Sequence, residues 1–181
     1  GYALDELIRK YKPFNKNGKG FNLASLICGS EGTLGVIVSA TLNLVNLPKH
    51  KELIVAHFSS DEQSLNIVRD LVKLNPSAVE YIDKPTLEAS KNNNEQKKNR
   101  IWIDGNPESV LIIEFFSSSL KELNSKIDKC QSMLLSNGAY SAKLINKEDR
   151  SKVWEVRKAG LGLLMGKVGP KKAVAVIEDA V

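Results

Sequence analysis

The sequence predicts an α+β protein in which a short N-terminal part precedes a larger, ferredoxin-like domain. Over residues 50–145, strand-like and helix-like patterns follow one another in the order β-α-β-β-α-β, which is typical of an antiparallel sheet with two helices on one face. The pattern changes at residues 46–50, so we expect the boundary between the two parts there. The chain has 181 residues, 42% of them hydrophobic and 26% charged, which suits a globular protein with one sizeable core or two small ones.

The N-terminal part, residues 1–48, carries the weaker structural signals. Its first twelve residues form a short amphipathic stretch, and Pro, Asn and Gly predict a loop over residues 13–20. Residues 26–28 are apolar and residues 36–45 alternate in polarity, so we expect strand edges at both places. Such edges would be exposed, and they would favour self-association with another copy of the chain.

The larger part, residues 49–181, shows regular elements with clear ends. Alternation predicts strands, apolar residues three and four apart predict helices, and Ser, Asp, Asn, Gly and Pro mark the ends. The expected strands cover residues 52–58, 78–82, 109–116, 140–145 and 172–177. The expected helices cover residues 61–74, 85–90 and 119–136, and residues 91–100 form a polar loop. A further helix is expected after a cap at residues 146–149, with an interruption at Gly160 and Gly162 and an end at Gly166.

The charge of the chain does not predict a nucleic-acid partner. The formal net charge is +5 and the pI is near 9.1, but the basic residues are scattered along the chain. The densest basic stretch, residues 91–100, contains no aromatic side chain on which a base could stack. We therefore expect a solvated loop at this stretch.

The composition also bears on location and on metals. No apolar stretch is long enough to span a membrane, and within the 181 residues no charged start followed by an apolar run resembles a signal peptide. Cys28 and Cys130 fit no metal-ligand spacing, so we expect two free thiols in a reducing compartment and no metal site. The expected location is cytoplasmic.

The most informative motif is Gly29-x-x-Gly32-x-x-Gly35. Glycines at this density let the backbone approach a ligand closely, and the N–H groups of such a turn suit an anion such as a pyrophosphate. The spacing matches neither the dinucleotide-binding fingerprint nor the P-loop. A tight turn with no ligand therefore remains an equal alternative on spacing alone.

The amino-acid sequence around these glycines is more specific for a protein family than their spacing is. Residues 26–44 resemble the closing segment of the FAD-binding domain in flavoproteins of the vanillyl-alcohol oxidase and p-cresol methylhydroxylase (PCMH) type. Within that family, the resemblance is to glycolate oxidase flavin subunits, D-lactate dehydrogenases and D-2-hydroxyglutarate dehydrogenases. Further stretches resemble landmarks of the cap, or substrate, domain of these FAD-linked oxidases: residues 76–83, 111–115, 153–157 and 177–181. The resemblance places residues 1–48 at the C-terminal end of the FAD-binding domain and residues 49–181 in the N-terminal part of the cap domain.

The resemblance implies oxidation of a 2-hydroxy acid by hydride transfer to FAD. Glycolate, D-lactate and D-2-hydroxyglutarate all fit it as substrates. Arg157 matches the cap-domain arginine that would bind the substrate carboxylate, and a surface arginine remains the alternative. The cofactor-binding residues that the resemblance implies are Gly29, Ser30, Glu31, Gly32, Thr33, Gly35, Val36 and Ile37.

The resemblance also implies partners and missing parts. In the family, the phosphate-binding segment and the residues that supply the base or metal site lie outside the stretch matched here, so we expect these 181 residues to be an inactive fragment without bound FAD. Trp154-x-x-Arg157 together with Glu178-Asp179 is most similar to dehydrogenases joined to an iron–sulfur electron-transfer domain or subunit. The parent protein could also lie at the periphery of a membrane.

A second hypothesis requires no catalysis. A ferredoxin-like fold can serve as a small-molecule or RNA-binding module, with the glycine motif acting only as a turn. The expected central strands supply Tyr81, Phe115 and Phe116, but no Arg or Lys flanks these aromatic residues. This pattern favours the flavoenzyme over the RNA-binding module.

Overall fold

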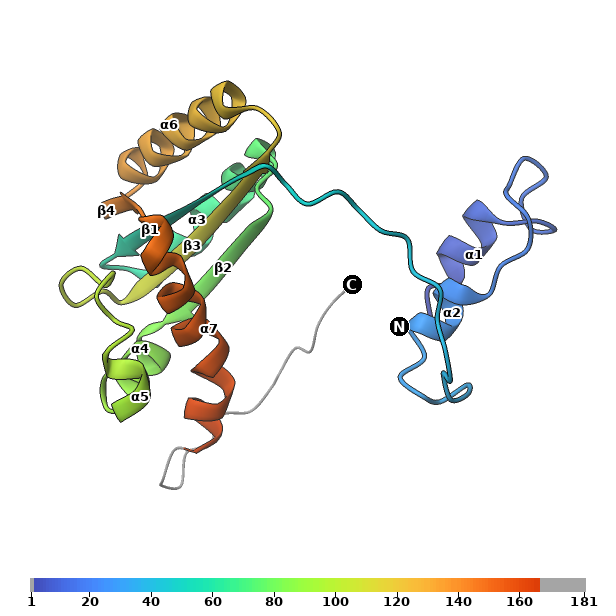
Figure 1. Cartoon of the computed structure of the whole chain (residues 1–181), viewed down its shortest axis with the longest axis horizontal. Helices are drawn as coiled ribbons and strands as arrows, with labels where there is room; N and C mark the ends of the chain where they lie inside the picture. Colours follow the sequence, from blue (N-terminus) through green and yellow to red (C-terminus); the bar gives the residue numbers. More distant parts are fainter. Residues whose placement is uncertain (1, 167–181) are drawn as a thin grey trace. The chain divides into compact units, whose positions relative to one another are not determined.

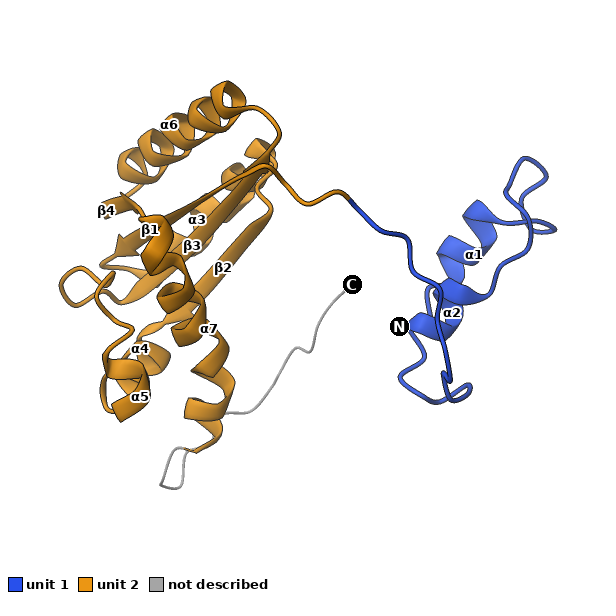
Figure 2. Ribbon diagram, in the orientation of Figure 1, with its two compact units in different colours: residues 1–45, 175–181 blue, residues 46–174 orange. Residues whose placement is uncertain are grey.

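The computed structural model describes residues 2–166, which divide into two units (Figures 1 and 2). The first unit ends at Val45 and the second begins at Asn46. The predicted strand over residues 172–177 lies outside the described residues. None of the helices in the described part of the chain is long and apolar enough to cross a membrane.

A four-stranded antiparallel sheet forms the centre of the second unit, with the strand order β2-β3-β1-β4. The strands are β1 (His50–Phe58), β2 (Ala78–Asp83), β3 (Ser109–Ser117) and β4 (Ala139–Leu144). In the register, Ile54 of β1 lies opposite Ile113 of β3 on one side and Leu144 of β4 on the other. This order is that of the ferredoxin-like fold, which confirms the predicted fold class.

One face of the sheet is covered by α3 (Asp61–Leu71) and α6 (Leu120–Ser136), as predicted (Figure 1). Alternate residues of β1 and β3 point to this face, and their side chains bury a core with the apolar sides of both helices. The largest fully buried members of this core are Phe58, Phe115, Leu71, Leu123 and Leu134. The α3 segment ends in a 3-10 turn, Val72–Leu74, because Asn75 takes a left-handed conformation just before Pro76.

The opposite face of the sheet is also covered, which the sequence did not predict. There α7 (Arg150–Met165), α4 (Lys84–Lys91) and the loop that carries Trp102 pack over the other residues of β1 and β3 (Figure 1). Val153 and Val156 of α7 are fully buried in this second core. The short turns α5 (Asn94–Lys97) and η2 (Lys147–Asp149) complete this unit, and α5 lies within the stretch predicted as a polar loop.

The predicted interruption of α7 is wrong. The helix continues through Gly160 and Gly162 to Met165. A glycine inside a helix is unfavourable by roughly 1 kcal/mol, but Gly160 is buried against α4, where the absence of a side chain permits close packing. Tertiary packing therefore outweighs the local preference.

The first unit contains two short helices, α1 (Leu4–Lys10) and α2 (Ala24–Cys28). The predicted strands at residues 26–28 and 36–45 are wrong: the first stretch lies in α2, and the second has no regular secondary structure. Alternating polarity produces a strand only when a neighbouring strand accepts its hydrogen bonds, and residues 36–45 have no such neighbour within the described chain.

Candidate functional site

The glycine motif forms a tight turn directly after α2. The Thr33 amide and hydroxyl both donate hydrogen bonds to the Ser30 carbonyl oxygen, at 2.9 and 2.6 Å. Ser30 itself is buried and donates from its hydroxyl to the Ile27 carbonyl oxygen at 2.8 Å. Glu31 and Gly32 both have positive φ values, 49° and 79°, so the chain turns sharply at these two residues. Only Gly32 adopts this conformation without strain, which explains a glycine there.

The turn presents its glycines to open space. A Cβ placed on Gly32 or Gly35 would meet no atom within 4 Å among the described residues. The chain that follows is equally uncovered, with Val36 89% and Val38 93% exposed. A small backbone surface beside apolar side chains is what a flat, partly apolar ring requires for close contact. The turn therefore leaves room for a flat ligand against its backbone.

The other predicted site residue, Arg157, lies on the exposed side of α7. Its Nε–H donates to Glu80 Oε2 at 2.7 Å, and the two side chains are 44% and 33% exposed. The helix is held in place by Val153 and Val156 in the core beneath it and by Arg150 at its first turn. Glu80 lies on the edge strand β2, so the ion pair ties α7 to the edge of the sheet.

Arg157 also lines a groove of about 310 Å³ between α7 and the start of α4. The outer edge of β2, at Tyr81 and Asp83, forms one wall, and Leu161 and Leu164 of α7 form the other. The groove has apolar and polar lining residues, and its one acid, Asp83, accepts a hydrogen bond from the Thr86 backbone N–H at 3.0 Å. Arg157 is its one basic residue, and a guanidinium can supply two charge-assisted hydrogen bonds to a small carboxylate. Glu80 does not line the groove.

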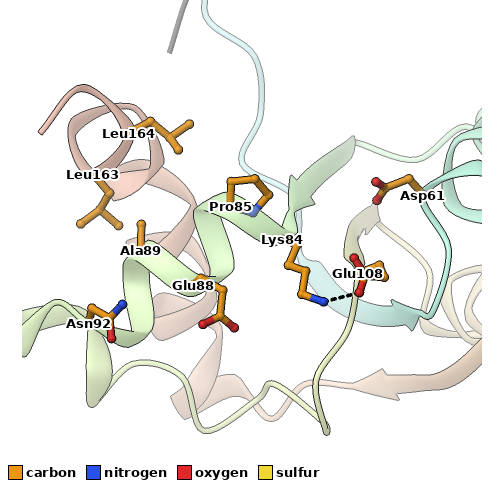
Figure 3. Close-up of a pocket in the computed structure, with 9 residues that line it drawn as sticks. All are labelled: Asp61, Lys84, Pro85, Glu88, Ala89, Asn92, Glu108, Leu163 and Leu164. Carbon is orange, nitrogen blue, oxygen red and sulfur yellow. Dashed lines mark hydrogen bonds and ion pairs between the residues drawn. The ribbon is translucent and has the colours of Figure 1, made fainter. Parts of the chain in front are cut away.

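A larger pocket, of about 710 Å³, lies beside this groove and was not predicted from the sequence (Figure 3). Leu163 and Leu164 border it at the end of α7, with Ala89 and Pro85 of α4 on the same side. At its other end Lys84 forms an ion pair with Glu108. Periodicity placed Leu163 on a helix, but it could not show that α4 lies beside that helix.

The predicted residues form two separate groups. Residues 29–37 of the first unit lie together in one turn, and Arg157 of the second unit lies with Glu80. No group of His, Cys, Asp and Glu that could hold a metal ion occurs among residues 2–166. Cys130 is buried in the core, which raises the pKa of its thiol to about 12. This thiol is therefore unreactive.

Comparison with known proteins identifies the second unit. Residues 47–181 match the family of FAD linked oxidases, C-terminal domain. The chain belongs to this family. The match confirms the resemblance seen in the sequence of this FAD-linked oxidase chain. FAD is the cofactor of the family.

Three curated relatives of the FAD-linked oxidase chain have names that state a 2-hydroxy acid as the substrate. Glycolate oxidase subunit GlcD of Bacillus subtilis is 25% identical over 181 residues, which cover 98% of this chain and 36% of that protein. D-2-hydroxyglutarate dehydrogenase of Pseudomonas putida is 26% identical over 88% of this chain and 17% of its own length. D-lactate dehydrogenase of Archaeoglobus fulgidus is 29% identical over 78% of this chain and 30% of its own length. The chain thus spans about a third of these relatives or less.

A solved structure supports the same fold. The chain of an alkyldihydroxyacetonephosphate synthase superposes with a TM-score of 0.55 at 18% sequence identity. The match covers 81% of this FAD-linked oxidase chain and 29% of the synthase chain. At this level of identity the likeness concerns the fold alone.

Proposed function

We propose that this chain is part of an FAD-dependent oxidoreductase that oxidises a 2-hydroxy acid by hydride transfer to the flavin. In this proposal residues 1–48 are the end of the FAD-binding domain, and residues 49–181 are the first part of the cap domain. The observation that carries the proposal is the family match over residues 47–181, together with relatives named for glycolate, D-lactate and D-2-hydroxyglutarate.

The turn at residues 29–37 would hold the flavin in the complete protein. Bound there, the flavin would supply the hydride acceptor, and an iron–sulfur domain or subunit would be a suitable carrier for the electrons. The turn contributes the positive φ at Gly32 and the uncovered backbone at Gly35. Thr33 stabilises this shape through its two hydrogen bonds to Ser30.

Arg157 would bind the substrate carboxylate. Its Nε is engaged by Glu80, which leaves the two Nη groups to form a fork that matches the two oxygens of a carboxylate. The groove has room for a small acid, and its leucines would reduce the competition from water. His57 does not supply the catalytic base, because its side chain is fully buried in the sheet.

The alternative of an RNA-binding module lacks its main requirement. Such a module stacks bases on aromatic residues of an open sheet face. Here α3 and α6 cover one face of the sheet, and α4, α7 and Trp102 cover the other. Phe115 is buried in the core, and the Tyr81 hydroxyl donates to Asp61 Oδ1 at 2.9 Å. The described sheet therefore offers no open face for stacking.

The test is the kinetics of Arg157→Lys and Arg157→Ala in the full-length protein. The lysine variant keeps the charge but loses the fork, so we expect a lower kcat/KM for the 2-hydroxy acid by roughly 30- to 150-fold, for a loss of about 2–3 kcal/mol. Flavin content should stay normal. Lys158→Ala, on the same exposed side of α7, is the matched control and should change neither quantity. Near-wild-type kinetics for both Arg157 variants would remove Arg157 from the site.

A further inference from the structure

We infer that Glu80 is a positioning residue for Arg157, holding the guanidinium so that its two Nη groups face the groove. This inference rests on the proposed role of Arg157 and extends it to a residue on a different element. Glu80 and Arg157 are 77 positions apart in the chain, on β2 and α7. Glu80 makes no contact with the groove itself, so it would act through Arg157 alone.

The atoms that form the ion pair support a positioning role. An arginine side chain has several rotatable bonds and, when half exposed, samples many rotamers. The contact from Nε–H to Glu80 Oε2, at 2.7 Å, restricts the rotamers that the guanidinium can adopt. Because this contact uses Nε, the pair of Nη groups stays available for a second carboxylate.

The placement of Glu80 supports the same conclusion. β2 is an edge strand whose Ile82 side chain is buried under α7, and Glu80 lies two positions earlier on the same face of the strand. The backbone at Glu80 is fixed, because β2 pairs with β3 and Glu80 lies opposite Ile112. A carboxylate on a rigid strand can orient a side chain on the facing helix better than one on a loop.

A competing role for Glu80 predicts the opposite change in KM when Glu80 is removed. If Glu80 occupied the Arg157 fork in place of the substrate, its removal would free the arginine and lower KM. If Glu80 positions Arg157, its removal raises KM, because the free guanidinium must be ordered when substrate binds. If the pair only stabilises α7, its removal lowers the melting temperature and leaves KM unchanged.

The first experiment tests the contact in the 181-residue chain without any cofactor. The chain has five arginines, so its Nε–H signals can be resolved by NMR, and Arg157→Lys identifies the signal of Arg157. Glu80→Gln should shift that signal and leave the signal of Arg150, whose Nε donates to Ile145, in place. Glu155→Gln, which removes another acid from the Arg157 helix, should shift neither signal. An unchanged Arg157 signal in Glu80→Gln would overturn the inference.

The second experiment measures KM and kcat in the full-length protein. Glu80→Ala should raise KM roughly fivefold with little change in kcat or flavin content, which is the size expected for a half-exposed pair. Glu80→Gln retains an oxygen that can accept from Nε–H, so it should recover most of the loss, and it carries the test if the alanine variant folds poorly. In an Arg157→Ala background, Glu80→Ala should raise KM no further.

The outcomes separate this inference from the proposed function. If Arg157→Ala raises KM and Glu80→Ala does not, or lowers it, Glu80 is not a positioning residue and the role of Arg157 stands. If Arg157→Ala leaves KM unchanged, the carboxylate-binding role of Arg157 fails and the role of Glu80 fails with it. Additive effects of the two substitutions would also overturn the inference, because they would show that Glu80 does not act through Arg157.

Discussion

Gly160 of α7 lies directly against Thr86 of α4, such that a Cβ on Gly160 would lie only 3.2 Å from Thr86 Cγ2. Both residues are buried, and this contact lies next to the groove that Arg157 lines. The missing side chain at Gly160 therefore sets how closely the two helices approach. The width of the groove depends on the same approach.

This contact predicts the effect of a larger side chain at Gly160. Gly160→Leu should lower the free energy of unfolding by about 1–3 kcal/mol, because the new side chain must displace α4. Gly160→Ala should have almost no net effect, because a gain of roughly 1 kcal/mol in helix propensity offsets the tight contact with Thr86. Urea unfolding of the 181-residue chain measures both.

Gly162, two positions later, is the matched control for Gly160. A Cβ on Gly162 would meet no atom within 4 Å in the described part of the chain. Gly162→Ala should therefore raise the free energy of unfolding by about 0.5–1 kcal/mol. A loss of stability at Gly162, or a tolerated leucine at Gly160, would contradict the packing that the structure shows.

A second prediction concerns the stability of the folded protein at acidic pH. His57 is fully buried, and its Nε2 accepts a hydrogen bond from the Asp104 backbone N–H at 3.1 Å. The folded protein therefore holds the neutral imidazole. Burial lowers the pKa of His57 from 6.5 to about 4, the attraction of Asp104 acts in the opposite direction, and Lys143 reinforces the lowering. Between these pH values the unfolded chain binds more protons than the folded one. The contribution of His57 to stability is therefore fully present above pH 6.5 and is lost as the pH falls towards about 4.

The loss amounts to about 3 kcal/mol over this range, at 1.36 kcal/mol for each unit of pKa. Urea unfolding at a series of pH values measures it. His57→Gln should flatten the acid limb of the stability curve relative to wild type. His50→Gln, at the start of the same strand, should retain the wild-type slope. Equal slopes for all three proteins would show that His57 does not titrate on unfolding.

A third prediction concerns Arg150, which attaches the first turn of α7 to the sheet. Its Nη1 donates to the Lys51 carbonyl oxygen at 2.5 Å, its Nε to the Ile145 carbonyl oxygen at 3.2 Å, and its Nη2 contacts Glu52 Oε2 at 2.5 Å. Arg150→Lys keeps the charge but can satisfy only part of this set, so it should lower the free energy of unfolding by about 1–2 kcal/mol. The exposed Arg69→Lys should change it by less than about 0.5 kcal/mol.

The sheet could be predicted from the sequence because its strands bury both faces against defined partners. Leu111, Ile113 and Phe115 point to one core while Val110 and Ile112 point to the other, which produces the continuous apolar run seen in the sequence. Residues 36–45 alternate just as clearly but form no strand, because pairing needs a neighbour that periodicity cannot reveal. The same limit applies to residues 26–28, which were predicted as a strand edge and lie in the short helix α2.

The candidate site was predictable only in part. The glycine spacing indicated a turn with a positive φ, which the structure has at Gly32. The pair of Glu80 and Arg157 could not be predicted, since it joins residues 77 positions apart on elements whose contact depends on α7 covering the second face of the sheet. A pattern assigns a residue to a face, but packing decides which helix lies on that face.

The last prediction separates a cofactor role of the glycine turn from a purely structural one. Gly35 does not have a positive φ, and a Cβ there would meet open space, so Gly35→Val should leave the unfolding of the 181-residue chain unchanged within about 0.5 kcal/mol. If the flavin packs against this turn, the same substitution in the full-length protein should sharply lower the flavin content per mole of protein, because the branched side chain would fill the space that the ring needs. Gly20→Val, at another open glycine outside the turn, is the matched control and should keep full flavin content. Flavin absorbance and the visible spectrum measure the occupancy, and normal flavin content in Gly35→Val would show that the cofactor does not pack against this turn.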